Sequence, residues 1–134
     1  MHKVAIVILA DTTQADGLGR VVNGLMAAKE FKDAKDDVQV VFSGAGTKWI
    51  GELAKPEHKL HGMYKDLQGS IVGACSFCAG AFGVAGEVAD SGVNLLEEYG
   101  TNMSFHSLVK TVIRSSLFKA HLWLAVHRAS KPIL

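Results

Sequence analysis

The chain has few cysteines, no long apolar stretch and no acidic residue near its C-terminal end. Cys75 and Cys78 are its only cysteines, too few for the disulfide framework of a small secreted domain. No apolar run reaches the roughly 20 residues that a membrane-spanning helix needs. Residues 1–4 lead directly into an apolar strand pattern, so we expect no secretory leader. We therefore expect a cytoplasmic protein that makes no membrane contact.

The composition fits one globular domain, with 134 residues, 49% of them hydrophobic and 20% charged. The net charge is +1, but every acidic residue lies at or before Glu98. Residues 111–134 hold four basic residues and no acid. These four charges are too widely spaced for a phosphate-binding surface, so we expect no nucleic-acid partner.

Apolar periodicity predicts alternating strands and helices. The expected strands cover 3–10, 37–42, 70–75 and 93–96, and the expected helices cover 18–35, a segment from Thr47, 78–88 and 104–110. Thr47 and Ser104 are the expected N-caps of their helices. This succession predicts an α/β fold, a three-layer α/β/α arrangement with a parallel, flavodoxin-like sheet of about five strands.

Cys75-Ser76-Phe77-Cys78 stands where a buried strand turns into a glycine-rich helix. A helix start favours the thiolate form of a cysteine, and the thiolate is the nucleophile. In a flavodoxin-like strand order, 2-1-3-4-5, the loop that begins at Asp11 would also adjoin Cys75. We therefore predict Cys75 and Cys78 as catalytic residues. The alternative is that both cysteines are small apolar core residues.

His58 and His61, together with the two cysteines, would supply four ligands of the kind zinc prefers. The predicted topology puts the histidines at the opposite edge of the sheet from the cysteines. We therefore interpret them as surface histidines and expect neither a metal nor a cofactor. Gly17-Leu18-Gly19 and Gly44-Ala45-Gly46 complete no phosphate-binding motif and are interpreted as tight turns.

Several segments together resemble the DsrE/DsrF-like family, which includes the TusD-related sulfur-transfer proteins. The resemblance covers about residues 3–110 and rests on the strand 3–10, on 43–49, on 75–84 and on 95–99 followed by 104–108. It implies a DsrEFH-like fold. It also implies cysteines that accept persulfide sulfur and pass it on, and assembly as a homo-oligomer, either a trimer or a hexamer.

The leading hypothesis is a sulfur-relay protein, a sulfurtransferase or sulfur carrier. Cys75 would take sulfane sulfur as a persulfide, and Cys78 would act as a resolving or modulating thiol. Its partner would be a sulfur donor or acceptor protein or a small sulfane-sulfur compound. One alternative is a non-catalytic oligomeric module that binds a small molecule or partner, with structural or regulatory cysteines. A thiol oxidoreductase is a third hypothesis.

The resemblance stops after Lys110. Relatives end in a strand like Gly-Tyr-Gln-Val-Ile-Thr-Phe, and one possible coding of 111–118, ACG GTT ATC AGG TCA TCA CTT TTT, encodes that ending when read two bases later. We therefore infer a frameshift near Lys110, with a family-like domain over 1–118 and an atypical tail over 119–134. Residues 112–118 are expected to form a fifth strand beside the fourth. Residues 120–127 are expected to have no native site and to form a helix or adhere to a neighbouring molecule.

Overall fold

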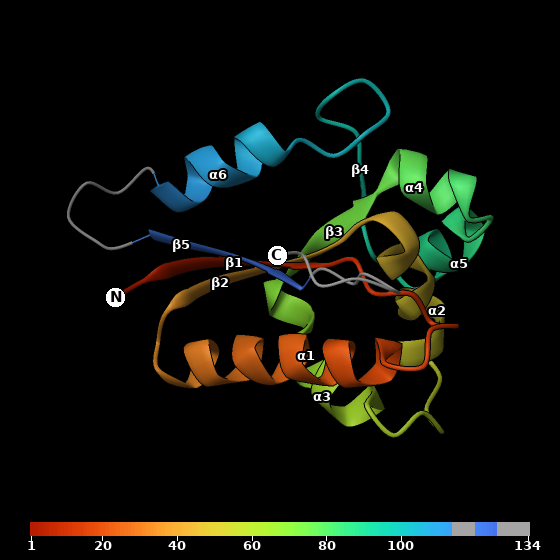
Figure 1. The fold of residues 1–134 in the computed structure, drawn as a ribbon, viewed down its shortest axis with the longest axis horizontal. Helices are drawn as coiled ribbons and strands as arrows, with labels where there is room; N and C mark the ends of the chain where they lie inside the picture. The colour runs from red at the N-terminus through yellow and green to blue at the C-terminus, as the bar shows by residue number, and fades with distance from the viewer. Residues whose placement is uncertain (114–119, 126–134) are drawn as a thin grey trace.

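The computed structural model describes residues 1–113 and 120–125 of the chain (Figure 1). Strands and helices alternate as the apolar pattern predicts, with short 3-10 segments, η1 and η2, before α2 and β3. The elements are β1 (Lys3–Ile8), α1 (Gly17–Asp33), β2 (Asp37–Phe42), η1 (Gly44–Lys48), α2 (Trp49–Leu53), α3 (His61–Asp66), η2 (Gln68–Ser70), β3 (Ile71–Cys75), α4 (Ser76–Ala81), α5 (Ala85–Asp90), β4 (Leu95–Leu96), α6 (Phe105–Ile113) and β5 (Ala120–Ala125).

The strands form a parallel sheet in the order β4-β3-β2-β1-β5. The predicted flavodoxin-like order is therefore wrong, because β2 lies between β1 and β3. β1 and β2 pair along their whole length, from Lys3 opposite Asp37 to Ile8 opposite Phe42. Both strands are apolar on both faces, so periodicity alone does not tell which of them takes the central place. The expected contact between the Asp11 loop and Cys75 depended on that strand order, so this prediction loses its basis.

Helices cover both faces of the sheet, with α1 and α3 on one side and α6 on the other (Figure 1). The side chains of β1 alternate between two apolar clusters, as a strand buried on both faces requires. The larger cluster, on the α1 face, includes Val4, Ile6, Ile8, Val21, Leu25, Phe42, Ile50, Leu53 and Tyr64. The smaller cluster, on the α6 face, consists of Ala5, Val7, Val41, Cys75, Met103 and Leu108.

A bulge at Val72 sets which face of the sheet receives Cys75. Val40 pairs with Ile71, but Val41 pairs with Gly73, so Val72 is an extra residue in β3. A bulge of this kind shifts the alternation of every following side chain by one position. Cys75 therefore joins the α6-face cluster. Without the extra residue it would point to the α1 face.

The glycine-rich helix predicted over 78–88 is two short helices, α4 and α5, so the single helix is wrong. Gly83 has a φ of 71° and ends the first helix. The Gly83 N–H donates to the Gly80 carbonyl at 3.0 Å, and the Val84 N–H donates to the Ala79 carbonyl at 2.8 Å. These two bonds are the Schellman arrangement, which favours glycine at the left-handed position.

Ser104 is confirmed as the N-cap of α6, since its hydroxyl accepts the Ser107 N–H at 3.0 Å. The helix runs to Ile113, beyond the predicted end at Lys110. Thr47 is not an N-cap. It lies inside η1, and its hydroxyl donates to the Gly44 carbonyl at 2.8 Å.

The predictions for the C-terminal region need two corrections. Residues 112 and 113 belong to α6, and the strand that follows, β5, pairs with β1 and not with β4. Residues 120–125 are a strand with a partner in the sheet, where the sequence predicts a segment without a site. The free edge of β1 explains both, because its backbone N–H and C=O groups need partners over six residues, whereas β4 is only two residues long. Residues 114–119, with the expected domain boundary, lie outside the described residues.

Within residues 1–113 and 120–125, none of the helices has the length and apolar character to cross a bilayer.

Candidate functional site

Cys75 ends β3 and immediately precedes α4, where the sequence predicts it. Its side chain is buried, with 1% of its surface exposed. The turn between β4 and α6 covers it. The Met103 N–H points at Cys75 Sγ at 3.4 Å, and Asn102 Oδ1 lies 3.8 Å from the same sulfur. Cys75 therefore sits in a closed, polar environment at the carboxyl end of the sheet.

The environment of Cys75 favours its thiolate on balance. Burial is the largest single influence and raises the pKa of the thiol. Hydrogen bonds from the backbone N–H groups of Met103 and Cys78, and from the side chains of Cys78 and Ser43, act in the opposite direction. Together these donors hold the Cys75 pKa below its ordinary value. Cys75 is thus the better nucleophile of the pair.

Cys78 lies one helical turn further along α4 and is half-buried. Burial raises the pKa of its thiol, and the hydrogen bond that it gives to Cys75 raises it further. Its Sγ lies 3.8 Å from Ser43 Oγ, and the Gly44 N–H also faces the sulfur. Cys78 therefore remains protonated more readily than Cys75 and donates to it. The two predicted site residues are brought together, but with opposite acid–base character.

A turn over 99–103 holds the cover of Cys75 in place. Tyr99 and Asn102 exchange two backbone hydrogen bonds, of 2.8 and 2.9 Å. The Phe77 N–H donates to the Thr101 carbonyl at 2.7 Å, which ties the start of α4 to the turn. The Phe77 side chain itself is 54% exposed. These backbone hydrogen bonds thus hold the turn over 99–103 against the Cys75 side chain.

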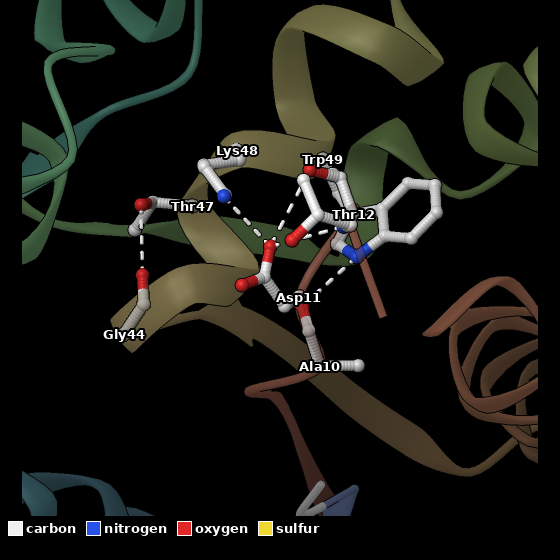
Figure 2. A network of polar contacts seen from close by, with 8 residues as sticks. Ala10, Asp11, Thr12, Gly44, Thr47, Lys48 and Trp49 are labelled. Atoms are coloured by element: carbon white, nitrogen blue, oxygen red, sulfur yellow. Dashed lines mark hydrogen bonds and ion pairs between the residues drawn. The ribbon is translucent and has the colours of Figure 1, made fainter. Parts of the chain in front are cut away.

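The Asp11 loop belongs to a separate polar network (Figure 2). Lys48 Nζ pairs with Asp11 Oδ1 at 2.7 Å and lies 5.5 Å from the centre of the Phe82 ring. The hydrogen bond from Lys48 holds the pKa of the Asp11 carboxyl below its usual value, although burial opposes this. Trp49 Nε1 donates to the Ala10 carbonyl at 2.9 Å. This network fixes η1 against the end of β1, and thereby positions Ser43 and Gly44 beside Cys78.

Gly46 is the residue that permits this close packing of η1. A Cβ at this position would lie 2.0 Å from the Ile8 carbonyl oxygen, which no side chain tolerates. Gly46 therefore permits the close approach of two backbones, and the predicted tight turn is the start of the 3-10 segment η1.

The histidines bond to nearby backbone groups. His58 Nδ1 accepts the Leu60 N–H at 3.0 Å, and His61 Nδ1 lies 2.8 Å from the Leu53 carbonyl. His58 also meets the ring of Trp49 edge-on at 6.3 Å. In the part of the chain that the structure describes, no three histidine, cysteine or acidic side chains converge in a way that would hold a metal.

Sequence reasoning assigned no role at the thiols to three residues that shape the cysteine environment: Ser43, Asn102 and Met103. Ser43 and Asn102 carry a weak signal, because each lies in a loop after an expected strand, at the edge of the sheet where Cys75 also lies. Met103 carries none. Met103 acts through its backbone N–H, which any residue except proline provides, and the fold of the turn brings both Asn102 and Met103 to the sulfur.

Comparison of the chain with family models, curated proteins and solved structures finds no match.

Proposed function

We propose that the protein is a sulfur-relay protein of the DsrE/DsrF-like kind in which Cys75 carries sulfur as a persulfide and Cys78 assists as a resolving or modulating thiol. The observation that carries the proposal is the hydrogen-bonded pair, with a lowered pKa on Cys75 and a raised pKa on Cys78. An activated thiol beside a protonated one suits acceptance of sulfur followed by its release. The quoted sequence segments add the family resemblance, and the proposal includes a DsrEFH-like three-layer fold.

In the loading step, the Cys75 thiolate attacks the outer sulfur of a donor persulfide, R–S–SH. A new S–S bond forms at Cys75 Sγ, the S–S bond of the donor breaks, and the donor leaves as the thiolate R–S⁻. The hydrogen bonds at Cys75 favour the attacking anion. Because Cys75 is buried, the turn over 99–103 has to move for the donor to reach it.

In the resolving step, the Cys78 thiolate attacks Cys75 Sγ of the persulfide and releases hydrosulfide. A Cys75–Cys78 disulfide remains. The sulfane sulfur is reduced to sulfide while the two thiols are oxidised, so no further oxidant is needed. A modulating Cys78 would instead keep its proton, and the sulfur would pass intact to an acceptor.

The test is mass spectrometry of the intact protein and its Cys75–Cys78 peptide after incubation with inorganic polysulfide. On wild-type protein we expect one added sulfur atom if Cys78 is a modulating thiol, or a Cys75–Cys78 disulfide if it is a resolving thiol. We expect neither product on Cys75→Ser and retention of the added sulfur atom on Cys78→Ser. Circular dichroism of both variants controls for folding. Loading that survives in Cys75→Ser and is lost in Cys78→Ser would reverse the two roles.

The burial of Cys75 favours a second candidate, a non-catalytic oligomeric binding module with structural or regulatory cysteines. A thiol with 1% of its surface exposed resembles a core residue. Thiols that remain unmodified by polysulfide, in a protein that is folded and oligomeric by light scattering, would select this candidate. Under either function we propose a cytoplasmic homo-oligomer, a trimer or a hexamer.

A further inference from the structure

A small cavity lies on the α6 face of the sheet, next to the cover of Cys75. Its volume is about 200 Å³. The apolar part of its wall comes from Val72, Leu96 and Met103, and its polar part from Gln39, Glu98 and Ser107. Met103 is buried, whereas Glu98 and Ser107 are exposed. The cavity therefore has an apolar interior and a polar, acidic rim.

The size and the lining of the cavity suit one long cationic side chain. Pockets for drug-sized ligands are larger, roughly 300–1,000 Å³. A lysine or arginine side chain has an apolar stem that packs along apolar surface and a charged end that stays near water. Glu98 is placed to receive that charge. Its Oε1 accepts the Ser104 N–H at 3.1 Å, and no cation pairs with it among the described residues.

The charge of the surrounding segment points to the same class of partner. Residues 66–109 build β3, β4 and the turn over 99–103, and they contain no lysine or arginine. The same segment carries the acidic residues Asp66, Glu87, Asp90, Glu97 and Glu98. Of these acids only Glu98 lines the cavity, and Lys110 on α6 lies just outside the segment. The attraction of a cationic partner to the cavity therefore depends on the Glu98 carboxylate itself.

Met103 links the cavity directly to the cysteine site. Met103 lines the cavity, and its backbone N–H donates to Cys75 Sγ at 3.4 Å. A partner anchored in the cavity therefore lies against the segment that covers the thiol.

We propose that the cavity is a docking site for a lysine or arginine side chain of a sulfur-carrying partner protein, with Glu98 as its carboxylate partner. This inference rests on the proposed sulfur relay. The anchored side chain holds the partner's persulfide beside the turn over 99–103 and so brings it to the Cys75–Cys78 pair.

Synthetic peptide persulfides test the proposal. Each peptide carries one cysteine persulfide in a glycine–serine background and a single lysine at one of the three positions before or after it. A matched series carries norleucine in place of lysine. We expect at least one lysine position to load the protein about tenfold faster than its norleucine match at low salt, with the difference reduced by salt.

The neighbouring acids Glu97 and Glu98 provide a matched pair of variants, because Glu98 lines the cavity and Glu97 is absent from its wall. Glu98→Gln keeps an oxygen for the Ser104 N–H but removes the charge. We expect it to abolish the advantage of lysine, and Glu97→Gln to preserve most of it. Equal loading by lysine and norleucine peptides, or an equal loss in both variants, would overturn the proposal.

Inorganic polysulfide, which has no cationic group, separates this proposal from the sulfur relay. Loading by polysulfide without any preference for lysine overturns the docking site and leaves the relay standing. Failure of polysulfide to load the protein overturns both. Sedimentation of wild-type protein and Glu98→Gln tests whether a second copy of the chain occupies the cavity instead. Self-association that is lost only in the variant would assign the cavity to that second copy and refute the partner proposed here.

Discussion

The two faces of the sheet are built differently. On the α1 face, α1, α2 and α3 cover the strands, and the cluster there is large and fully buried. On the α6 face, one helix and a turn provide the cover, the cluster is small, and a cavity of about 200 Å³ remains beside β3 and β4. Cys75 belongs to the second face. Among the side chains that the structure describes, most of the apolar burial is therefore on the α1 face, and the proposed thiol chemistry is on the α6 face.

Because of this difference between the faces, the turn that covers Cys75 is packed less tightly than the core on the α1 face. A tightly packed interior resists rearrangement, because every displaced side chain leaves a cavity or a clash. The turn over 99–103 is held chiefly by backbone hydrogen bonds and borders open space. Segments with few buried contacts open at lower free energy than the core does. The proposed relay therefore requires movement of the cover on the face where the described residues bury less apolar surface.

The largest expected effect tests the difference between the faces directly. Leu25→Ala, on the α1 face, should lower the free energy of unfolding by about 2–5 kcal/mol, because the close-packed surroundings cannot fill the space. Leu108→Ala, on the α6 face, should cost about 2 kcal/mol or less, because it borders an existing cavity. Urea denaturation measures both, with the exposed Met26→Ala as the control. Equal losses would refute the distinction.

A charge placed beside the thiol should have the next largest effect. Asn102→Asp puts a carboxylate near Cys75 Sγ, where the native amide oxygen lies 3.8 Å away, and so raises the pKa of the thiol. We expect alkylation of Cys75 by iodoacetamide at neutral pH to slow about tenfold. In the wild-type protein the alkylation rate should rise with pH, with its midpoint below 9.0, the ordinary thiol pKa. In the variant this midpoint should move to higher pH.

The neutral variant Asn102→Leu is the control for this substitution, because it removes the amide without adding charge. A rate in Asn102→Asp equal to that in Asn102→Leu would mean that the carboxylate does not act on the Cys75 thiolate electrostatically.

Ser43→Ala should have a smaller effect on the same thiols. Its hydroxyl lies 3.8 Å from Cys78 Sγ and lowers the pKa of both cysteines. Losing one neutral hydrogen bond should slow alkylation about threefold at neutral pH. Ser43→Thr keeps a hydroxyl and should react nearly as the wild type does. Faster alkylation in Ser43→Ala would show that the hydroxyl protects the thiols rather than activating them.

The smallest effect concerns the Lys48–Asp11 ion pair. Its side chains are 23% and 21% exposed, so Lys48→Met should lower the free energy of unfolding by about 1 kcal/mol or less at neutral pH. The pKa of Asp11 is lowered in the folded state, so this contribution is present above the ordinary value of 3.8 and is lost as the pH falls through the folded value.

Denaturation of wild type and Lys48→Met at neutral and acidic pH measures this pH dependence. Lys29→Met, which breaks an exposed ion pair on α1, is the comparison. A difference between wild type and Lys48→Met that persists below the folded pKa would assign the effect to the contact of the Lys48 ammonium with the Phe82 ring.

Local chemistry allowed much of the fold to be predicted from the sequence. The strand over 37–42 and the cap at Ser104 are confirmed, and Cys75 lies at the strand end where the apolar run stops. The break in the glycine-rich helix was missed, although Gly83 was visible. Several glycines in that segment could end a helix, and the sequence does not tell which of them does. Only the Schellman hydrogen bonds show that Gly83 ends it.

Strand order was beyond the reach of the sequence, because a strand that is apolar on both faces fits any central position in a parallel sheet. The segment over 120–125, expected to have no site in the sheet, was mispredicted for a related reason. Its apolar residues indicate a strand or a helix equally, and the choice depends on the long unpaired edge that β1 presents.

The sequence by itself determined that the chain alternates strands and helices and that two cysteines lie where a strand turns into a helix, because apolar periodicity and residue type are local properties. Tertiary structure alone decided which face of the sheet holds Cys75, since the bulge at Val72 reverses the alternation of β3. It also decided which groups surround the sulfur. The Met103 N–H and the Ser43 hydroxyl reach Cys75 and Cys78 through packing between segments distant in the chain, and no local pattern encodes those contacts.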